Sequence, residues 1–185
     1  MNADNTTAKQ YRSYDHAQKQ RDGYDFTIDY DGNWYYHSGA LAGPIKREKL
    51  AALFGGAGHG FMAGKGLLID EDGKYWLRSP DGQYGVDVED VPFVIVDYSC
   101  DSNGDLVFVT NFDEQVLVRE SGDVFLKEEP LCGEPVLYCH VRKGLVARVS
   151  RAVFASLIFD GVLDEADAGY VLHCGTHDFT LGVLS

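Results

Sequence analysis

Two stretches of the sequence, residues 32–69 and 135–159, are rich in cations and poor in carboxylates. Glu48 is the only acidic residue of the first stretch, and the second stretch has none. Their basic residues are Lys46, Arg47, Lys49, Lys65, Arg142, Lys143, Arg148 and Arg151. A guanidinium beside the free backbone N–H groups of a helix start binds phosphate or carboxylate well. The pattern therefore predicts an anion site formed by Arg47, Arg142, Arg148 and Arg151.

A second interpretation of these cations stays open. Basic side chains on a solvated helix face also pair with carboxylates of neighbouring strands, and such exposed pairs contribute little to stability. The cations would then have no ligand. Under the first interpretation, Trp34 joins the candidate site as a flat ring on which a ligand can stack.

The run VDVEDVPF, residues 86–93, concentrates carboxylates before a proline. Asp87 and Glu89 would share one face of a strand, which suits a Mg²⁺ site or a general base, and Asp90 lies beside them. The alternative is a strand end stiffened by Pro92, with its charges in water or paired to the basic stretches.

Six residues of the types that bind zinc lie near the second basic stretch: Cys132, Cys139, His140, His173, Cys174 and His177. They include no CxxC pair, and neighbouring residues of a strand point to opposite faces. We therefore expect buried thiols and surface histidines, with no metal ligand. No serine, threonine or cysteine stands in a nucleophile motif, so no catalytic residue is predicted.

The glycine-rich segment GGAGHGFMAGKG, residues 55–66, is not a phosphate-binding loop. His59 stands where a Walker motif needs glycine, and Gly66 follows Lys65 in place of Ser or Thr. The segment would also leave a helix and enter a strand, the reverse of a dinucleotide-binding loop. A surface insertion is the better interpretation.

Composition limits the classes of partner. The chain of 185 residues has 16 basic and 29 acidic side chains, a net charge of -13, which argues against general nucleic-acid or anionic-membrane binding. No stretch approaches the ~20 apolar residues of a membrane span, and the first residues lack the apolar core of a signal peptide. A cytoplasmic location and four reduced cysteines are expected.

Short runs of β-branched and aromatic residues between DG, SPDG or NG signals predict strands. Two helices are expected, one from Pro44 to Gly55 and one over about residues 145–159 with an apolar stripe. A hairpin, a helix and a closing hairpin thus occur twice. This order predicts an α+β fold of two similar repeats, each with antiparallel strands packed on one helix.

The expected organisation is a polar arm over residues 1–25, a first repeat over 26–110 and a second over 111–185. The closing hairpins YWLRSPDGQYGV and YVLHCGTHDFTL align without a gap. The whole alignment pairs Leu77 with Leu172, Tyr84 with Phe179, Arg47 with Arg151 and Gly32 with Gly122. Because the two basic helix starts are then equivalent, the anion site is expected where the repeats meet.

Several motifs together resemble a bacterial domain-of-unknown-function family, DUF1285. They are DGNW from Asp31, GPIKREKLAALF from Gly43, YWLRSPDGQYGVDVEDVPF from Tyr75, HVRKGLVARVSRAVF from His140 and CGTHDFTLG from Cys174. The chain departs from the family pattern in its longer glycine-rich stretch and in Ser79, where the family more often has threonine.

The resemblance implies a duplicated α+β core, a second half similar to a pleckstrin-homology-like barrel, and a groove between the halves for a nucleotide-like ligand in signalling. The matching polar positions are Trp34, Arg47, Asp87, Asp90, Arg142, Arg148 and Arg151.

Three functions follow, in order of preference: a regulatory module for an anionic small molecule, a structural or protein-interaction module without a ligand, and a metal-assisted enzyme using Asp87, Glu89 and Asp90. The sequence identifies no cofactor and no oligomeric state.

Overall fold

The computed structural model describes residues 23–38, 41–44, 66–79, 82–129, 133–167 and 169–184. The chain divides between Val91 and Pro92 into two compact units. This division differs from the expected boundary after residue 110, because the strands over 93–110 pair within the sheet of the second unit. Each unit is described by itself.

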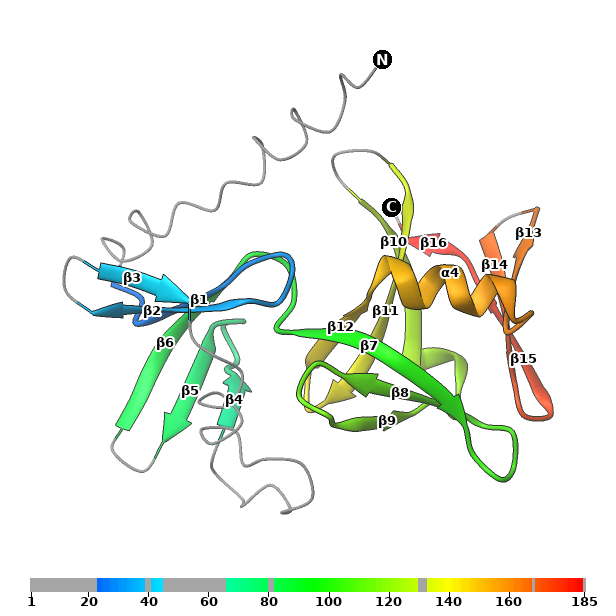
Figure 1. Ribbon diagram of the computed structural model, residues 1–185, viewed down its shortest axis with the longest axis horizontal. Helices are drawn as coiled ribbons and strands as arrows, with labels where there is room; N and C mark the ends of the chain where they lie inside the picture. Colours follow the sequence, from blue (N-terminus) through cyan, green and yellow to red (C-terminus); the bar gives the residue numbers. More distant parts are fainter. Residues whose placement is uncertain are drawn as a thin grey trace. The chain divides into compact units, whose positions relative to one another are not determined.

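The first unit contains one six-stranded sheet, coloured blue to green in Figure 1. Its strands are β1 (Phe26–Ile28), β2 (Trp34–Ser38), β3 (Leu41–Pro44), β4 (Gly66–Ile69), β5 (Tyr75–Ser79) and β6 (Gly82–Val88). Their order is β3-β2-β1-β6-β5-β4, with β1 parallel to β6 and the other pairs antiparallel. Alternation puts Phe26, Ile28, Leu77 and Val86 into the core.

The second unit contains a seven-stranded sheet and a three-stranded sheet. The larger one, in the order β16-β10-β11-β12-β7-β8-β9, comprises β7 (Phe93–Cys100), β8 (Leu106–Thr110), β9 (Gln115–Leu117), β10 (Val124–Glu128), β11 (Pro135–Arg142), β12 (Leu145–Val149) and β16 (Val183–Leu184). The smaller one comprises β13 (Leu163–Ala166), β14 (Gly169–Cys174) and β15 (His177–Leu181). A 3-10 turn, η1 (Ser121–Asp123), precedes β10. Leu126, Leu137, Ala147 and Phe93 extend the core across four neighbouring strands.

One turn design closes four hairpins of the chain. The first loop residue accepts a hydrogen bond from the backbone N–H four residues later, and the fourth residue has a positive φ. These residue pairs are Asp29 with Gly32, Asp70 with Gly73, Asp101 with Gly104 and Thr110 with Asp113. Glycine adopts this conformation freely, and aspartate tolerates it, so the turns follow from local sequence.

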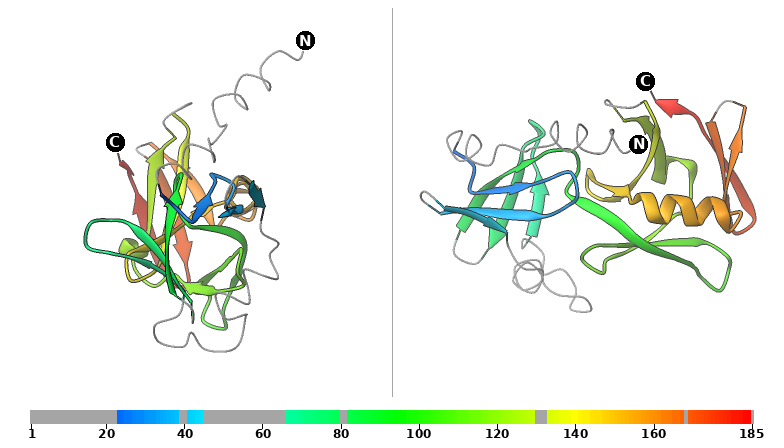
Figure 2. Two further views of the ribbon diagram at one scale, coloured as in Figure 1. Left: turned by 90° about the vertical axis from the view of Figure 1, so that its left-hand side faces the viewer. Right: turned by 45° about the horizontal axis from the view of Figure 1, so that its top comes forward.

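The helix α4 spans Arg151–Phe159 and lies alongside β7, as Figures 1 and 2 show. Ser150 caps it by accepting a hydrogen bond from the backbone N–H of Val153. The expected helix over residues 145–159 is therefore wrong in its first third, where Leu145–Val149 is a strand. The tight turn at Lys143 and Gly144, both with positive φ, folds this segment back along β11.

The expected α+β class with one helix in each repeat is wrong. Over the described residues the chain is mainly β, with sixteen strands, η1 and α4. The first expected helix falls largely outside the described residues, and its proposed start, Pro44, ends β3. The strand segments are rich in β-branched and aromatic residues, which pack well against their neighbours on a pleated sheet.

The closing hairpins of the two units have the same register, as their gapless alignment predicted. Leu77 lies opposite Tyr84 in the first unit, and Leu172 lies opposite Phe179 in the second. The expected equivalence of Gly32 and Gly122 is wrong. Gly32 lies between β1 and β2, which pair, whereas Gly122 lies between β9 and β10, which pair with β8 and β11 instead of with each other.

Candidate functional site

Arg142 forms a half-buried ion pair at the end of β11. Its Nε donates to Glu114 Oε1 at 3.1 Å, and its guanidinium lies 5.6 Å from the centroid of the Phe93 ring. Burial raises the pKa of Glu114, and the charge of Arg142 opposes that shift. Burial likewise lowers the pKa of Arg142 against the charge of Glu114. The guanidinium therefore already has a carboxylate partner and an aromatic contact.

Arg151, the first residue of α4, faces two carboxylates. Its Nη2 lies 3.2 Å from Glu129 Oε2 and 3.7 Å from Glu134 Oε2. The Glu129 side chain is buried, whereas that of Arg151 is largely exposed. At this helix start, carboxylates of the chain itself thus already pair with the guanidinium of Arg151.

A β-bulge separates Arg142 from Arg148. Val141 is the extra residue of β11, since His140 lies opposite Val146 and Arg142 lies opposite Leu145. Arg142 therefore shares a face with buried Leu145, whereas Arg148 shares the other face with its strand neighbours Tyr138 and Val94. The two arginines do not converge on one face of the sheet.

Arg148 belongs to a set of aromatic and basic side chains on β10, β11 and β12, namely Phe125, Lys127, Tyr138, His140 and Arg148, which we call the aromatic–basic platform. The Phe125 and Tyr138 rings are parallel within 8°, with centroids 5.4 Å apart. Lys127 Nζ lies 5.5 Å and 5.7 Å from these two centroids. The His140 ring lies 5.2 Å from that of Phe125.

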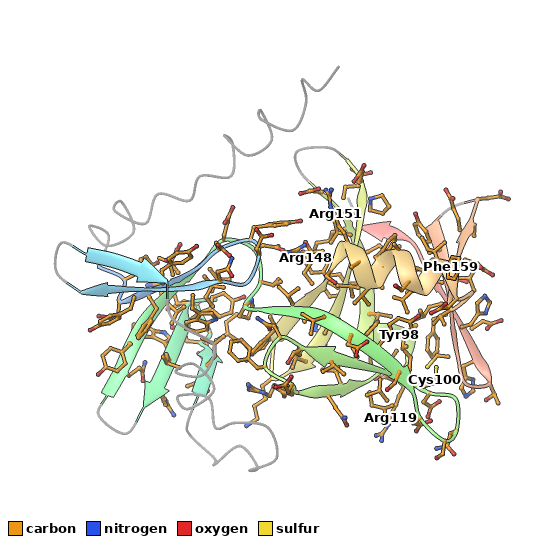
Figure 3. All side chains as sticks on the ribbon, viewed as in Figure 1. Tyr98, Cys100, Arg119, Arg148, Arg151 and Phe159 are labelled. Carbon is orange, nitrogen blue, oxygen red and sulfur yellow. The ribbon has the colours of Figure 1, made fainter. Side chains whose placement is uncertain are left out.

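The side chains of the platform range from buried to exposed. Tyr138 and Arg148 are each 6% exposed, Phe125 is half-buried, and Lys127 and His140 are exposed. Figure 3 labels Arg148 and Arg151 near the start of α4. The accessible part of the platform therefore offers part of the Phe125 ring, an ammonium group and an imidazole.

The candidate residues of the first unit have different environments. Trp34 is 1% exposed, and the centroid of its ring lies 6.1 Å from that of Phe26, so the Trp34 ring is part of the core. Burial raises the pKa of Asp87 in β6, and the charge of Asp90 adds to the burial that raises the pKa of Tyr75. Arg47 lies outside the described residues.

Among the described residues, no group of three or more His, Cys, Asp and Glu side chains is placed to hold a metal ion. Cys139 is buried, which raises the pKa of its thiol to about 12. Glu89 accepts a hydrogen bond from the backbone N–H of Tyr30 at 2.7 Å. Cys132 lies outside the described part of the chain.

His173 bridges two carboxylates across the three-stranded sheet. Its Nδ1 lies 2.7 Å from Asp178 Oδ1, and its Nε2 lies 3.1 Å from Asp164 Oδ2. These hydrogen bonds, that to Asp178 first, raise the pKa of His173. Only a protonated imidazole donates to both carboxylates.

The His173 bridge is expected to make stability depend on pH. A raised pKa in the folded chain adds stability that is fully present below the unfolded pKa of about 6.5 and is lost as pH rises through the folded value. His173→Gln should therefore cost more stability at pH 5.5 than at pH 9, by less than ~1 kcal/mol because the groups are exposed. Urea unfolding at both pH values measures this difference, and equal losses would contradict it.

Within the described residues, no helix is long and apolar enough to cross a membrane.

Sequence reasoning missed Phe125, Lys127 and Tyr138 as site residues. The signal was the alternation in VFLK and VLYCHV, which puts Phe125 and Lys127 on one face of β10 and Tyr138 and His140 on one face of β11. The pairing of those faces depends on strand register, which neither run reveals alone.

Comparison with known proteins gives one family and similar folds. The family model described as "Protein of unknown function (DUF1285), C-terminal domain" matches residues 92–181, nearly the whole second unit. A crystal structure of a DUF1285 family protein from Silicibacter pomeroyi DSS-3 is similar, with a TM-score of 0.64 and 28% identity over 86% of this chain and 80% of that chain. Another, from Shewanella baltica OS155, has a TM-score of 0.51 and 20% identity over 74% and 92%. No curated protein matches.

Proposed function

We propose that this chain, whose residues 92–181 match the C-terminal domain model of the DUF1285 family, is a regulatory module that binds an anionic, nucleotide-like small molecule. That family model assigns no function. The aromatic–basic platform of the second unit supports this proposal. A planar ligand group would pack against Phe125, while its negative charge would meet Lys127 and His140.

The observation that carries the proposal is the position of Lys127. Its ammonium group lies at nearly equal distances, 5.5 Å and 5.7 Å, from two parallel rings, which leaves its outer side to water. A cation held over aromatic rings keeps a defined position and pairs with an anion without much further ordering. Arg148 lies on the same face of the sheet, opposite Tyr138.

The platform modifies the expected ligand set. Arg142 and Arg151 have carboxylate partners, so we assign them to holding the fold and give Lys127 the role of the contacting cation. A contribution from Trp34, Arg47, Asp87 and Asp90 of the first unit stays a prediction. A signalling role would follow if a partner protein responds to the bound state.

A thermal-shift screen tests the proposal. Nucleotides, cyclic nucleotides and phosphorylated metabolites at millimolar concentration should include one that raises Tm, since a ligand at 100 times Kd stabilises by about 2.7 kcal/mol. Lys127→Gln should weaken that ligand by about tenfold or more. Arg119→Gln, which changes an exposed arginine outside the platform, is the matched control. A screen without any stabilising ligand, or equal effects of the two variants, would refute the proposal.

A second candidate function is a structural or protein-interaction module without a ligand. The ion pairs of Arg142 with Glu114 and of Arg151 with Glu129 favour it, because the basic residues then balance internal charges. The same screen separates the candidates. A module without a ligand would show no thermal shift, and Arg148→Ala, at a 6% exposed position, would lower Tm.

A further inference from the structure

The helix α4 is apolar on nearly every side. Its sequence, RAVFASLIF, contains two polar residues, Arg151 and Ser156. Val153 and Leu157 are buried against the rest of the second unit, yet Phe159 is 90% exposed and Ile158 is 41% exposed. A helix that is hydrophobic all round is normally covered on all sides. The composition of α4 therefore indicates a surface that something else covers.

The exposed residues form a regular stripe, which we call the outer face of α4: Ala152, Ala155, Ser156 and Phe159. Their spacing of three and four residues puts them on one side of the helix. The small side chains permit close approach of another backbone, and Phe159 projects at the C-terminal end, opposite Arg151 in Figure 3. This arrangement suits one aromatic anchor beside a shallow contact surface.

The outer face is not needed to hold α4 in place. The helix is fixed by the Ser150 cap, by buried Leu157 and by the contact of the Phe154 and Tyr170 rings at 5.5 Å. The Tyr98 hydroxyl also donates to Asp160, which ends the helix. Because these contacts lie elsewhere, the exposure of Phe159 has no structural explanation within the described part of the second unit.

The C-terminal end of the outer face is acidic, whereas the first end is not. At the first end, Arg151 pairs with Glu129 and Glu134, and Arg148 lies nearby, so neither sign of charge prevails there. At the other end, Asp160 is exposed beside the negative end of the helix dipole. Burial and the hydrogen bond to Asp160 raise the pKa of Tyr98 to about 12, and the charge of Asp97 contributes to this shift. Asp97 therefore lies near the same end of the helix.

We propose that the outer face of α4 binds an amphipathic segment of another protein, whose apolar side chains cover Phe159 and whose flanking lysines or arginines meet the acidic C-terminal end, with Asp160 and Asp97. A second copy of this chain is the poorer occupant, because its own α4 would bring like charges together and each chain carries a net charge of -13.

The size of the surface sets the expected strength. A helix of nine residues is about 14 Å long. A contact of that length lies at the small end of specific interfaces, so the complex is a transient one with micromolar affinity. Its affinity should fall with added salt, because the flanking charge pairs are exposed.

A synthetic peptide tests the proposal on the full chain. The probe is a fluorescent amphipathic helix of about three turns, with leucines on one side and lysines on the flanks. Fluorescence anisotropy should give micromolar binding, and Phe159→Ser should weaken it about tenfold or more. Phe159→Leu should retain most of the affinity. Phe159 is 90% exposed, so both variants should fold like the wild type.

Two comparisons make the outcome decisive. An otherwise identical peptide with glutamates for lysines should not bind, and equal binding of both peptides would overturn the proposed charge preference. Sedimentation of the protein alone should show a monomer. Self-association that Phe159→Ser abolishes would instead identify a second copy of this chain as the occupant and overturn the proposal. Lys127→Gln should leave peptide binding unchanged, which separates this surface from the aromatic–basic platform.

Discussion

Replacing Gly169 by alanine is expected to lower the free energy of unfolding by about 3 kcal/mol or more. Gly169 begins β14 with a φ of 139°, a conformation that side-chain-bearing residues rarely adopt. A Cβ at this position would lie 2.1 Å from the carbonyl oxygen of Leu181. That oxygen belongs to the paired strand β15, so the clash cannot be relieved without opening the three-stranded sheet.

The matched control for this change is Gly182→Ala. Gly182 follows β15 directly, its φ is not positive, and a Cβ there would meet nothing within 4 Å. Urea unfolding followed by circular dichroism should give a large loss for Gly169→Ala and almost none for Gly182→Ala. A thermal scan should show a drop of about 10 °C or more for the first variant. Similar losses for both variants would mean that the clash is relieved by local movement.

Cys174→Ala is expected to destabilise the chain by about 2–4 kcal/mol, because the thiol completes a backbone ladder. Its Sγ accepts a hydrogen bond from the Leu106 N–H at 3.1 Å and donates to the Val118 carbonyl at 3.3 Å. Val118 N–H in turn donates to the Leu106 carbonyl. The thiol thus bridges the Leu106 N–H and the Val118 carbonyl, which in a regular ladder would bond to each other directly. Burial raises the pKa of the thiol, which keeps it protonated.

Serine at position 174 is the informative second variant. A hydroxyl can donate and accept at the same place, so Cys174→Ser should recover part of the loss, limited by its shorter bond lengths. Cys100→Ala, at an exposed position, should have little effect. Chemical denaturation compares the three variants. A loss for Cys174→Ala no larger than that for Cys100→Ala would show that the ladder does not need the thiol.

Local sequence predicts the hairpins well because each turn contains its own hydrogen-bonding side chain. Asp29, Asp70 and Asp101 each bond the backbone four residues later, and this requires no distant partner. The register of the closing hairpins follows from the same locality. Locality is not sufficient, however, because the runs on either side of Ser121 and Gly122 do not pair with each other.

The helix–strand boundary at Ser150 could not be predicted in the same way. Leu145 and Val149 fit a helical stripe and also an extended strand, and tertiary pairing decides between them. Pairing of β12 with both β11 and β7 satisfies its backbone on two sides, which a lone helical turn would not do. The strand therefore takes residues that the helical pattern alone assigns to α4.

The sequence shows the cations of the stretch over residues 135–159 but not the partners that they meet in the fold. The cation-rich stretch does lie in one unit, yet Glu114 and Glu129 reach Arg142 and Arg151 from 28 and 22 residues away. Because these carboxylates are distant in the sequence, the local charge of the basic stretch does not reveal them. The platform depends on the register of β10 with β11, which is also a tertiary property.

Because Val141 is an extra residue in β11, the side chains of His140 and Arg142 lie on opposite faces of the sheet. Up to His140, one set of alternate positions belongs to the aromatic–basic platform, and after the bulge Arg142 belongs to the ion pair with Glu114. The chemistry of the platform can therefore change by substitution at Tyr138 or His140 without altering the Arg142 contacts. Pairing this strand regularly, with Val141 kept and no bulge, would have the opposite effect, because His140 and Arg142 would then share one face and a guanidinium would stand where the platform now ends.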